Sequence, residues 1–462
     1  MAIETVLGWI GSHEAASLDR LCAWLRIPSI STDPAHAPDI ARAASFAEAE
    51  LRALGFAARQ VPTPGHPVVL AHHPGPAGGS HPPVLFYGHY DVQPADPEAL
   101  WESPPFEPRI EAGPHGPRVV ARGAVDDKGQ VMTFLTALRA WHEAGGGIPV
   151  PVTVVLEGEE EIGSPHLEPF LTAHAAELGA GFALISDTNM WDRETPALTT
   201  RLRGLCTCEI TLHGPARDLH SGLFGGAALN PITALARLLG ALHDDTGRVQ
   251  IPGFYDRVEP PSAEERAGWA ALGFDEARFL GAVGLGAPAG EAGVPALERL
   301  WARPTAEING IWGGYAGPGS KTIIPAEASA KLSFRLVPAQ DPEAVFDGFR
   351  RFVEERLPAA ARAEIRLHGL SPGIAVRAGT PAMAAARAAL GRVFGRPPVL
   401  IGSGGSIPVV EQIRRVLGLD TLLMGFGLDD DRIHSPNEKF DLACFHAGTR
   451  AHALLLGELA RR

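Results

Sequence analysis

The chain lacks the features that membrane-spanning, secreted and nucleic-acid-binding proteins need. No apolar run approaches the ~20 residues of a membrane-spanning helix. The first residues, from Met1 to Thr5, carry neither a basic nor a long apolar segment, and they predict no signal peptide. Acidic residues outnumber basic ones by 53 to 40, and the net charge of −13 argues against nucleic acid as a partner. We therefore expect a cytoplasmic protein.

Cysteine is also scarce, with four residues in 462. Cys206 and Cys208 fit an alternating strand that points both side chains to one apolar face. We interpret these two, together with Cys22 and Cys444, as reduced residues of the core rather than as redox or metal-binding groups. The hydrophobic content of 45% and charged content of 20% are those of a soluble globular protein with room for two or three domains.

Short apolar runs alternate with helical patterns over residues 1–196. Such alternation predicts an α/β domain, in which a mostly parallel sheet has helices on both faces. Residues 61–83 are expected to form loops. The runs interpreted as strands of this series are Val84–Tyr87, Arg118–Ala124, Val152–Leu156 and Phe182–Ile185.

The pattern of expected strands and helices changes at about residue 197. Strands with one polar face and segregated helices predict an inserted α+β domain over residues 197–369. Helices are expected to begin after Asn230 and Asp341, each of which precedes a proline. The α/β pattern returns over residues 370–462, which predicts a second segment of the first domain, with a further helix beginning at Thr380.

An acidic run follows the apolar run Val152–Leu156. It reads Glu-Gly-Glu-Glu-Glu-Ile-Gly-Ser over residues 157–164. Adjacent carboxylates about 4 Å apart repel by roughly 1 kcal/mol in water and by more in a drier pocket. A bound cation would relieve that repulsion. Taken alone, the run fits a solvated acidic turn better than a metal site.

Other metal-ligand candidates occupy the same position relative to the expected strands. His89, Asp126, Asp187 and the pair Glu160-Glu161 each come just past a strand end. Ligands bind beyond the carboxyl ends of the strands in parallel sheets. Together with a histidine in the loop at 434, these residues make up the inventory of a two-metal hydrolytic site. Each candidate is weak by itself.

The residues resemble those of the M20 (aminoacylase/carnosinase-like) metallopeptidase family, in its dipeptidase branch. Eight motifs match in order and span most of the chain. They are GHYDVQP (88–94), RGAVDDKG (122–129), EGEEEIGS (157–164), SDT (186–188), DLHSGLFGG (218–226), PGSKTIIP (318–325), GGSIPV (404–409) and HSPNEK (434–439).

The resemblance implies a set of metal ligands and catalytic groups. It implies two divalent ions per subunit, with Zn²⁺ favoured and Mn²⁺ or Co²⁺ as alternatives. Glu160 would be the general base and acid acting on a metal-bridging hydroxide, and Asp91 would orient His89. The peptide bond between Asp126 and Asp127 is expected to be cis. One metal would be bound by His89, Asp126 and Asp187, and the other by Asp126, Glu161 and His434.

The resemblance also implies that residues 1–196 and 370–462 form the catalytic domain. It implies that the inserted domain, residues 197–369, is a lid and dimerisation domain that contributes substrate contacts. His220 would stabilise the oxyanion and, in this family, is donated by the other subunit of a homodimer. Arg335 would grip the C-terminal carboxylate of the substrate. A solvated surface charge is the alternative for Arg335. The remaining substrate-binding candidates are Gly404, Gly405, Ser406, His368 and Asn309.

The family pattern favours one activity and leaves others open. An aspartate at position 187 accompanies dipeptidases, so hydrolysis of dipeptides or short peptides with a free C-terminus is expected. An N-acyl amino acid deacylase or a carboxypeptidase on the same scaffold is the alternative, and a non-catalytic binding protein is a more distant one. Close dipeptidase relatives often carry Arg-Glu where this chain has Gly402-Ser403, so substrate preference within the branch stays open.

Overall fold

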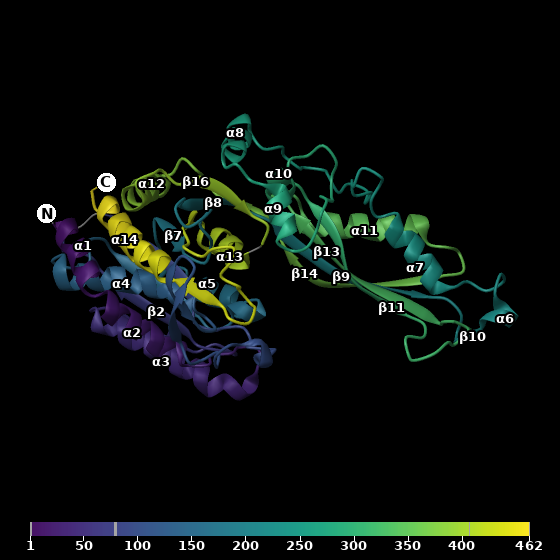
Figure 1. Ribbon diagram of the computed structural model, residues 1–462, viewed down its shortest axis with the longest axis horizontal. Helices are drawn as coiled ribbons and strands as arrows, with labels where there is room; N and C mark the ends of the chain where they lie inside the picture. Colours follow the sequence, from purple (N-terminus) through teal and green to yellow (C-terminus); the bar gives the residue numbers. More distant parts are fainter. Residues whose placement is uncertain (1, 78–80, 406, 462) are drawn as a thin grey trace. The chain divides into compact units, whose positions relative to one another are not determined.

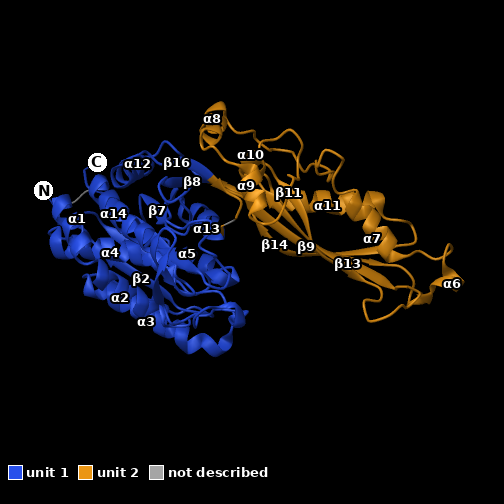
Figure 2. Ribbon diagram, in the orientation of Figure 1, with its two compact units in different colours: residues 1–200, 376–401, 408–462 blue, residues 201–375, 402–407 orange. Residues whose placement is uncertain are grey.

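A computed structural model describes residues 2–77, 81–405 and 407–461. The chain forms two compact units, which are coloured separately in Figure 2. The first unit comprises residues 1–200, 376–401 and 408–462, and the second comprises residues 201–375 and 402–407. Among the described residues, no helix is both long and apolar enough to span a membrane.

A nine-stranded sheet organises the first unit (Figure 1). Its strand order is β1-β2-β6-β3-β7-β17-β8-β15, and β16 pairs with β8. The four central strands β6, β3, β7 and β17 are parallel to their neighbours within this group. The strands are β1 (Ala57–Val61), β2 (Val68–His73), β3 (Val84–His89), β6 (Val152–Glu157), β7 (Phe182–Ile185), β8 (Ala197–Leu202), β15 (Ile374–Ala375), β16 (Val399–Ser403) and β17 (Thr421–Leu423).

Helices pack around this sheet. In strands β3 and β6 every residue is buried, which explains why both read as unbroken apolar runs. Helix α4 contacts α1, α2 and α14, while α5 packs against α13. The predicted α/β class with a mostly parallel sheet is confirmed. The helices are α1 (Ala2–Ser12), α2 (Glu14–Leu25), α3 (Ala37–Ala53), α4 (Lys128–Ala144), α5 (Leu167–His174), α12 (Pro381–Phe394), α13 (Pro408–Leu417) and α14 (Leu442–Leu459).

Two local predictions for this unit were wrong. Residues 61–83 include strand β2, which pairs antiparallel with β1 and with β6. The apolar run Val68–Ala71 is short, and the glycines and prolines on both sides of it led to the prediction of a loop. Residues 116–120 do not join the central sheet either. They form strand β5 of a separate three-stranded sheet made of β4 (Arg109–Gly113), β5 (Gly116–Val120) and β18 (Lys439–Asp441).

A four-stranded antiparallel sheet organises the second unit. Its order is β11-β13-β9-β14, and alternate residues of β9 and β13 are buried in a core with α7 and α11. Cys206 and Cys208 lie in this core, and all four cysteines of the chain are buried and free, as predicted. Strands β10 and β12 pair only with each other, in a separate two-stranded sheet. The strands of this unit are β9 (Gly204–His213), β10 (Leu219–His220), β11 (Thr305–Gly313), β12 (Ile323–Ile324), β13 (Glu327–Leu336) and β14 (Arg362–Ser371).

The helices of the second unit begin where their capping residues predict. The side chains of Asn230 and Asp341 accept hydrogen bonds from the first turns of α7 and α11, as Thr380 does for α12 in the first unit. Residues 245–304 form an insertion with three short helices. The helices of this unit are α6 (Ser221–Phe224), α7 (Pro231–Gly240), α8 (Ala263–Ala271), α9 (Glu276–Gly281), α10 (Ala296–Trp301) and α11 (Pro342–Arg356).

Candidate metal centre

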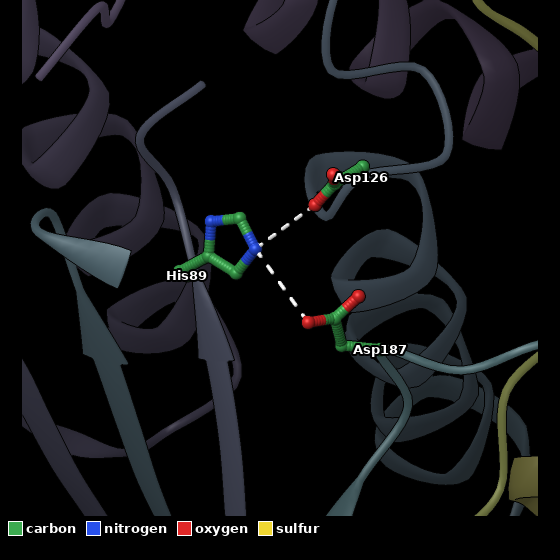
Figure 3. Close-up of side chains that lie close together, drawn as sticks. All are labelled: His89, Asp126 and Asp187. Atoms are coloured by element: carbon green, nitrogen blue, oxygen red, sulfur yellow. Dashed lines mark ion pairs between the residues drawn. The ribbon is translucent and has the colours of Figure 1, made fainter. Parts of the chain in front are cut away.

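Three predicted ligands meet at the carboxyl end of the central sheet. His89 is the last residue of β3, Asp187 follows β7 by two residues, and Asp126 lies just before α4. His89 Nε2 points between the two carboxylates (Figure 3), 3.1 Å from Asp126 Oδ1 and 3.9 Å from Asp187 Oδ2. One ligand atom from each residue lies within 4.8 Å of the other two. This spacing suits a single metal ion.

A second group shares Asp126 with the first. His434 Nε2 lies 2.9 Å from Asp126 Oδ2 and 3.3 Å from Glu161 Oε2. Gln93 donates a 2.7 Å hydrogen bond to the same glutamate oxygen. His434 has a left-handed backbone conformation, with φ of 60°, in an exposed loop. Because the two oxygens of Asp126 face different groups, this residue can bridge two ions.

The chemistry of these groups fits divalent cations. His89 Nε2 is fully buried and makes no hydrogen bond, although a carboxylate oxygen lies beside it. Burial and the charge of Asp126 raise the pKa of Asp187 to about 7. Hydrogen bonds to Asp126 and Glu161 raise the pKa of His434 to about 10. These shifts show a concentration of negative charge, which bound cations would neutralise.

Asp91 lies behind His89 and organises the loop that carries the glutamates. Its carbonyl oxygen lies 3.1 Å from His89 Nδ1, and its Oδ1 lies 3.3 Å from the same atom. The carboxylate also accepts the backbone N–H groups of Glu160 and Glu161, at 3.3 Å and 3.0 Å. Asp91 therefore holds both the imidazole and the loop in place.

Glu160 is in the same loop as the ligand Glu161, in a short 3₁₀ turn at residues 160–162. Burial raises the pKa of Glu160 well above its usual value, and the nearby Asp187, Glu161 and Asp126 contribute to the shift. Among the described residues, none forms a hydrogen bond with the side-chain carboxylate of Glu160. A carboxylate held close to the ligands but free of a protein partner can accept a proton from water.

Sequence reasoning missed the residue that anchors Asp126. Glu438 is fully buried, and it accepts hydrogen bonds from the backbone N–H groups of Gly123, Val125 and Asp126, at 2.9 to 3.2 Å. It also forms a buried 2.7 Å ion pair with Arg122. The following bond, between Asp126 and Asp127, is cis, as expected. Glu438 stands four residues after His434 in a quoted motif, so the signal was present in the sequence.

Comparison with known proteins decides the family. The model of peptidase family M20/M25/M40 matches residues 85–458. The chain belongs to this family. The match covers every metal-ligand candidate and both units, in agreement with the resemblance drawn from the motifs.

Individual M20 relatives cover all or nearly all of the chain. The Cys-Gly metallodipeptidase dug1 of Schizosaccharomyces pombe is 32% identical over 100% of this chain and 99% of its own length. The crystal structure of human carnosine dipeptidase 1 superposes with a TM-score of 0.83 at 28% identity, over 100% of this chain and 99% of the other. The M20 family metallo-carboxypeptidase Sso-CP2 from Sulfolobus solfataricus has a TM-score of 0.85 at 31% identity, over 96% of this chain and 99% of the other.

Glu159, the remaining acid of the run, has a different environment from its two neighbours. Its carboxylate pairs with His166 at 2.8 Å and accepts the backbone N–H of His66 at 3.1 Å. These contacts connect the acidic loop to the loop between β1 and β2. Glu159 is not part of either ligand group of the M20 site.

The remaining site candidates of this M20 chain belong to the second unit. His220 is exposed and caps α6, accepting the N–H of Gly222 at 3.0 Å. Arg335 is partly buried on β13. His368 and Asn309 are exposed, at irregularities of β14 and β11, and Gly404 and Gly405 lie in the loop after β16. Ser406 is outside the described residues. The roles of these residues remain predictions.

Proposed function

We propose that this protein is a two-metal dipeptidase that hydrolyses dipeptides or short peptides with a free C-terminus. The observation that carries the proposal is the pair of ligand groups that share Asp126, with Glu160 beside them. The names of the relatives support the substrate class, since the Schizosaccharomyces pombe enzyme is a Cys-Gly metallodipeptidase and the human one a carnosine dipeptidase. We further propose a cytoplasmic location.

The chain's own residues supply proton transfer and orientation. His89, Asp126 and Asp187 would hold one ion, and Asp126, Glu161 and His434 the other, with Zn²⁺ favoured over Mn²⁺ or Co²⁺. When bound, two such ions polarise a carbonyl group and acidify water. Glu160 would take the proton of the attacking water and give it to the departing amine. Asp91 contacts both His89 and the loop of Glu160, and so holds them in fixed positions relative to each other.

A second candidate function is favoured by one relative. Sso-CP2, at 31% identity, is named a metallo-carboxypeptidase. A carboxypeptidase would use the same ligands and the same base but accept longer peptides. The N-acyl amino acid deacylase that the sequence left open has no such support among these three relatives.

A substrate panel tests the proposed function. We expect the metal-loaded enzyme to hydrolyse unblocked dipeptides at least about tenfold more efficiently, in kcat/KM, than N-acetyl amino acids or N-blocked tripeptides. The measurement is kcat/KM by release of the free C-terminal amino acid. Equal or better hydrolysis of the blocked peptides would instead support the carboxypeptidase, and preference for N-acetyl amino acids the deacylase.

We propose that the active form is a homodimer in which His220 serves the partner's site. His220 lies in an exposed segment of the second unit, between β10 and the short helix α6. Its neighbours Leu223 and Phe224 are 78% and 42% exposed, which is unusual for large apolar side chains. A partner subunit would cover them.

Mixing two inactive variants tests donation between subunits. Glu160→Gln subunits and His220→Ala subunits are each expected to be inactive as homodimers, because one lacks the base and the other an oxyanion donor. After dissociation and reassociation of a mixture, activity should return, since one site of each mixed dimer is complete. A mixture that exchanges subunits but stays inactive would contradict donation by the partner.

A further inference from the structure

Two arginine side chains share one face of the four-stranded sheet in the second unit. Arg335 of β13 lies opposite Leu205 of β9. Arg203 comes two residues before Leu205 in an extended chain, so it projects from the same face. The other face is apolar and carries Cys206 and Phe334 into the core. The two guanidinium groups are thus neighbours on the polar face.

Arg203 is bound to the glycine loop that follows β16. Its Nε donates a 3.1 Å hydrogen bond to the carbonyl oxygen of Gly404. Its backbone N–H donates to the carbonyl oxygen of Gly405 at 3.2 Å. A Cβ atom on Gly404 would lie 3.0 Å from Arg203 Nη2, so the loop packs directly against the guanidinium group. The side chain of Arg203 therefore fixes the position of this loop.

Neither arginine forms an ion pair with a carboxylate of the described residues. Burial and the nearby charge of Arg335 lower the pKa of Arg203 to about 10, and the charge of Glu307 offsets part of this shift. Two neighbouring cations that a single glutamate compensates only in part repel each other, and an anion bound between them would relieve the repulsion.

Arg203 also lines a cavity of about 300 Å³ between this sheet and the insertion. Part of its wall is apolar, including Phe279, Leu280 and Leu300. The other arginines of the wall are paired, Arg299 with Glu276 and Arg303 with Glu291. The cavity thus offers one guanidinium without an ion pair at the sheet, the carboxylate of Glu307 in the same wall, and an apolar space beside them. An amino-acid side chain would fit next to a carboxylate held there.

We propose that Arg203 is a second carboxylate-binding residue of the substrate site. Its Nη atoms share the C-terminal carboxylate of the substrate with Arg335, while its Nε and backbone N–H hold the Gly404–Gly405 loop beside that carboxylate. The adjacent cavity takes the C-terminal side chain. This proposal rests on the proposed function, because it assigns Arg203 a role in binding the peptide's free C-terminus.

Kinetics with paired substrates test the role of Arg203. Wild type, Arg203→Met and Arg203→Lys are compared on a dipeptide and on its C-terminal amide, in the metal-loaded enzyme. For Arg203→Met we expect KM for the dipeptide to rise about 10- to 100-fold, since a charge-assisted contact is lost, with kcat reduced less. KM for the amide should change less than about threefold. Arg203→Lys should recover part of the loss, because it keeps the charge without the fork.

Arg362→Met is the matched control, since Arg362 is exposed near the other end of the same sheet, opposite His213. It should leave both KM values unchanged. An unchanged dipeptide KM in Arg203→Met, or equal increases for dipeptide and amide, would overturn the role of Arg203 while the proposed function stands. A wild type that hydrolyses no dipeptide would instead overturn the proposed function, and the role of Arg203 with it.

Discussion

Replacing Glu160 by glutamine is expected to lower kcat on a dipeptide about 10²- to 10⁴-fold, the usual contribution of a general base and acid. Glutamine keeps the size and the backbone contacts of the loop, including the hydrogen bond from residue 160 to Asp91. It cannot accept a proton. Because Glu160 belongs to neither ligand group, the variant should still bind two metal ions per chain. Steady-state kinetics and elemental analysis of the same preparation check both expectations.

Glu159→Gln is the matched control for this experiment. Glu159 is the adjacent glutamate, but its carboxylate contacts His166 and the backbone of His66. We expect its kcat to remain within about threefold of wild type, since none of these contacts reaches the ligands. A fully active Glu160→Gln enzyme, or an inactive Glu159→Gln enzyme with normal metal content, would show that the base has been assigned to the wrong residue.

Replacing Glu438 by alanine is expected to destabilise the protein by about 3–5 kcal/mol, because Arg122 would remain buried without its partner. The N–H groups of Gly123, Val125 and Asp126 would also lose their acceptor. Glu438→Gln keeps one acceptor oxygen and should cost less. Both changes loosen the segment that presents Asp126, so we expect weaker metal binding as well as lower stability.

Denaturant unfolding of the metal-free proteins measures the stability change without the contribution of bound metal. Glu168→Ala is the control. Its ion pair with Arg415 is short, at 2.6 Å, but both side chains are about half exposed, and such pairs contribute roughly 0–1 kcal/mol. Equal effects of the changes at 438 and 168 would contradict the anchoring role of Glu438.

The part of the site that follows the central strands was predictable from the sequence. His89 is the last residue of one buried parallel strand and Asp187 follows another by two residues, and the carboxyl ends of such strands meet at one edge of a sheet. Asp91 was predictable from its spacing, two residues beyond His89. The same reasoning placed Asp126 after a strand of this sheet. Asp126 does lie with the other ligands, but the strand before it belongs to another sheet.

Asp126 reaches the site by another route. The strand before it, β5, pairs with β4 and β18 in a different sheet. The segment of Asp126 is held by Glu438, which lies 312 residues further along the chain. Spacing within the sequence cannot reveal such a contact. The relation of Arg203 to the glycine loop was hidden for the same reason, since 201 residues separate Arg203 from Gly404. Only the register of β9 and β13 places Arg203 beside Arg335.

Metal stoichiometry tests the central claim most directly. The demetallated protein is titrated with Zn²⁺, and separately with Mn²⁺, while bound metal is counted by elemental analysis after gel filtration. We predict two ions per chain in the wild type, and fewer than two in Asp126→Asn, whose carboxylate both ligand groups share. A wild type that binds no metal, or an Asp126→Asn variant that still binds two ions with wild-type affinity, would contradict the account.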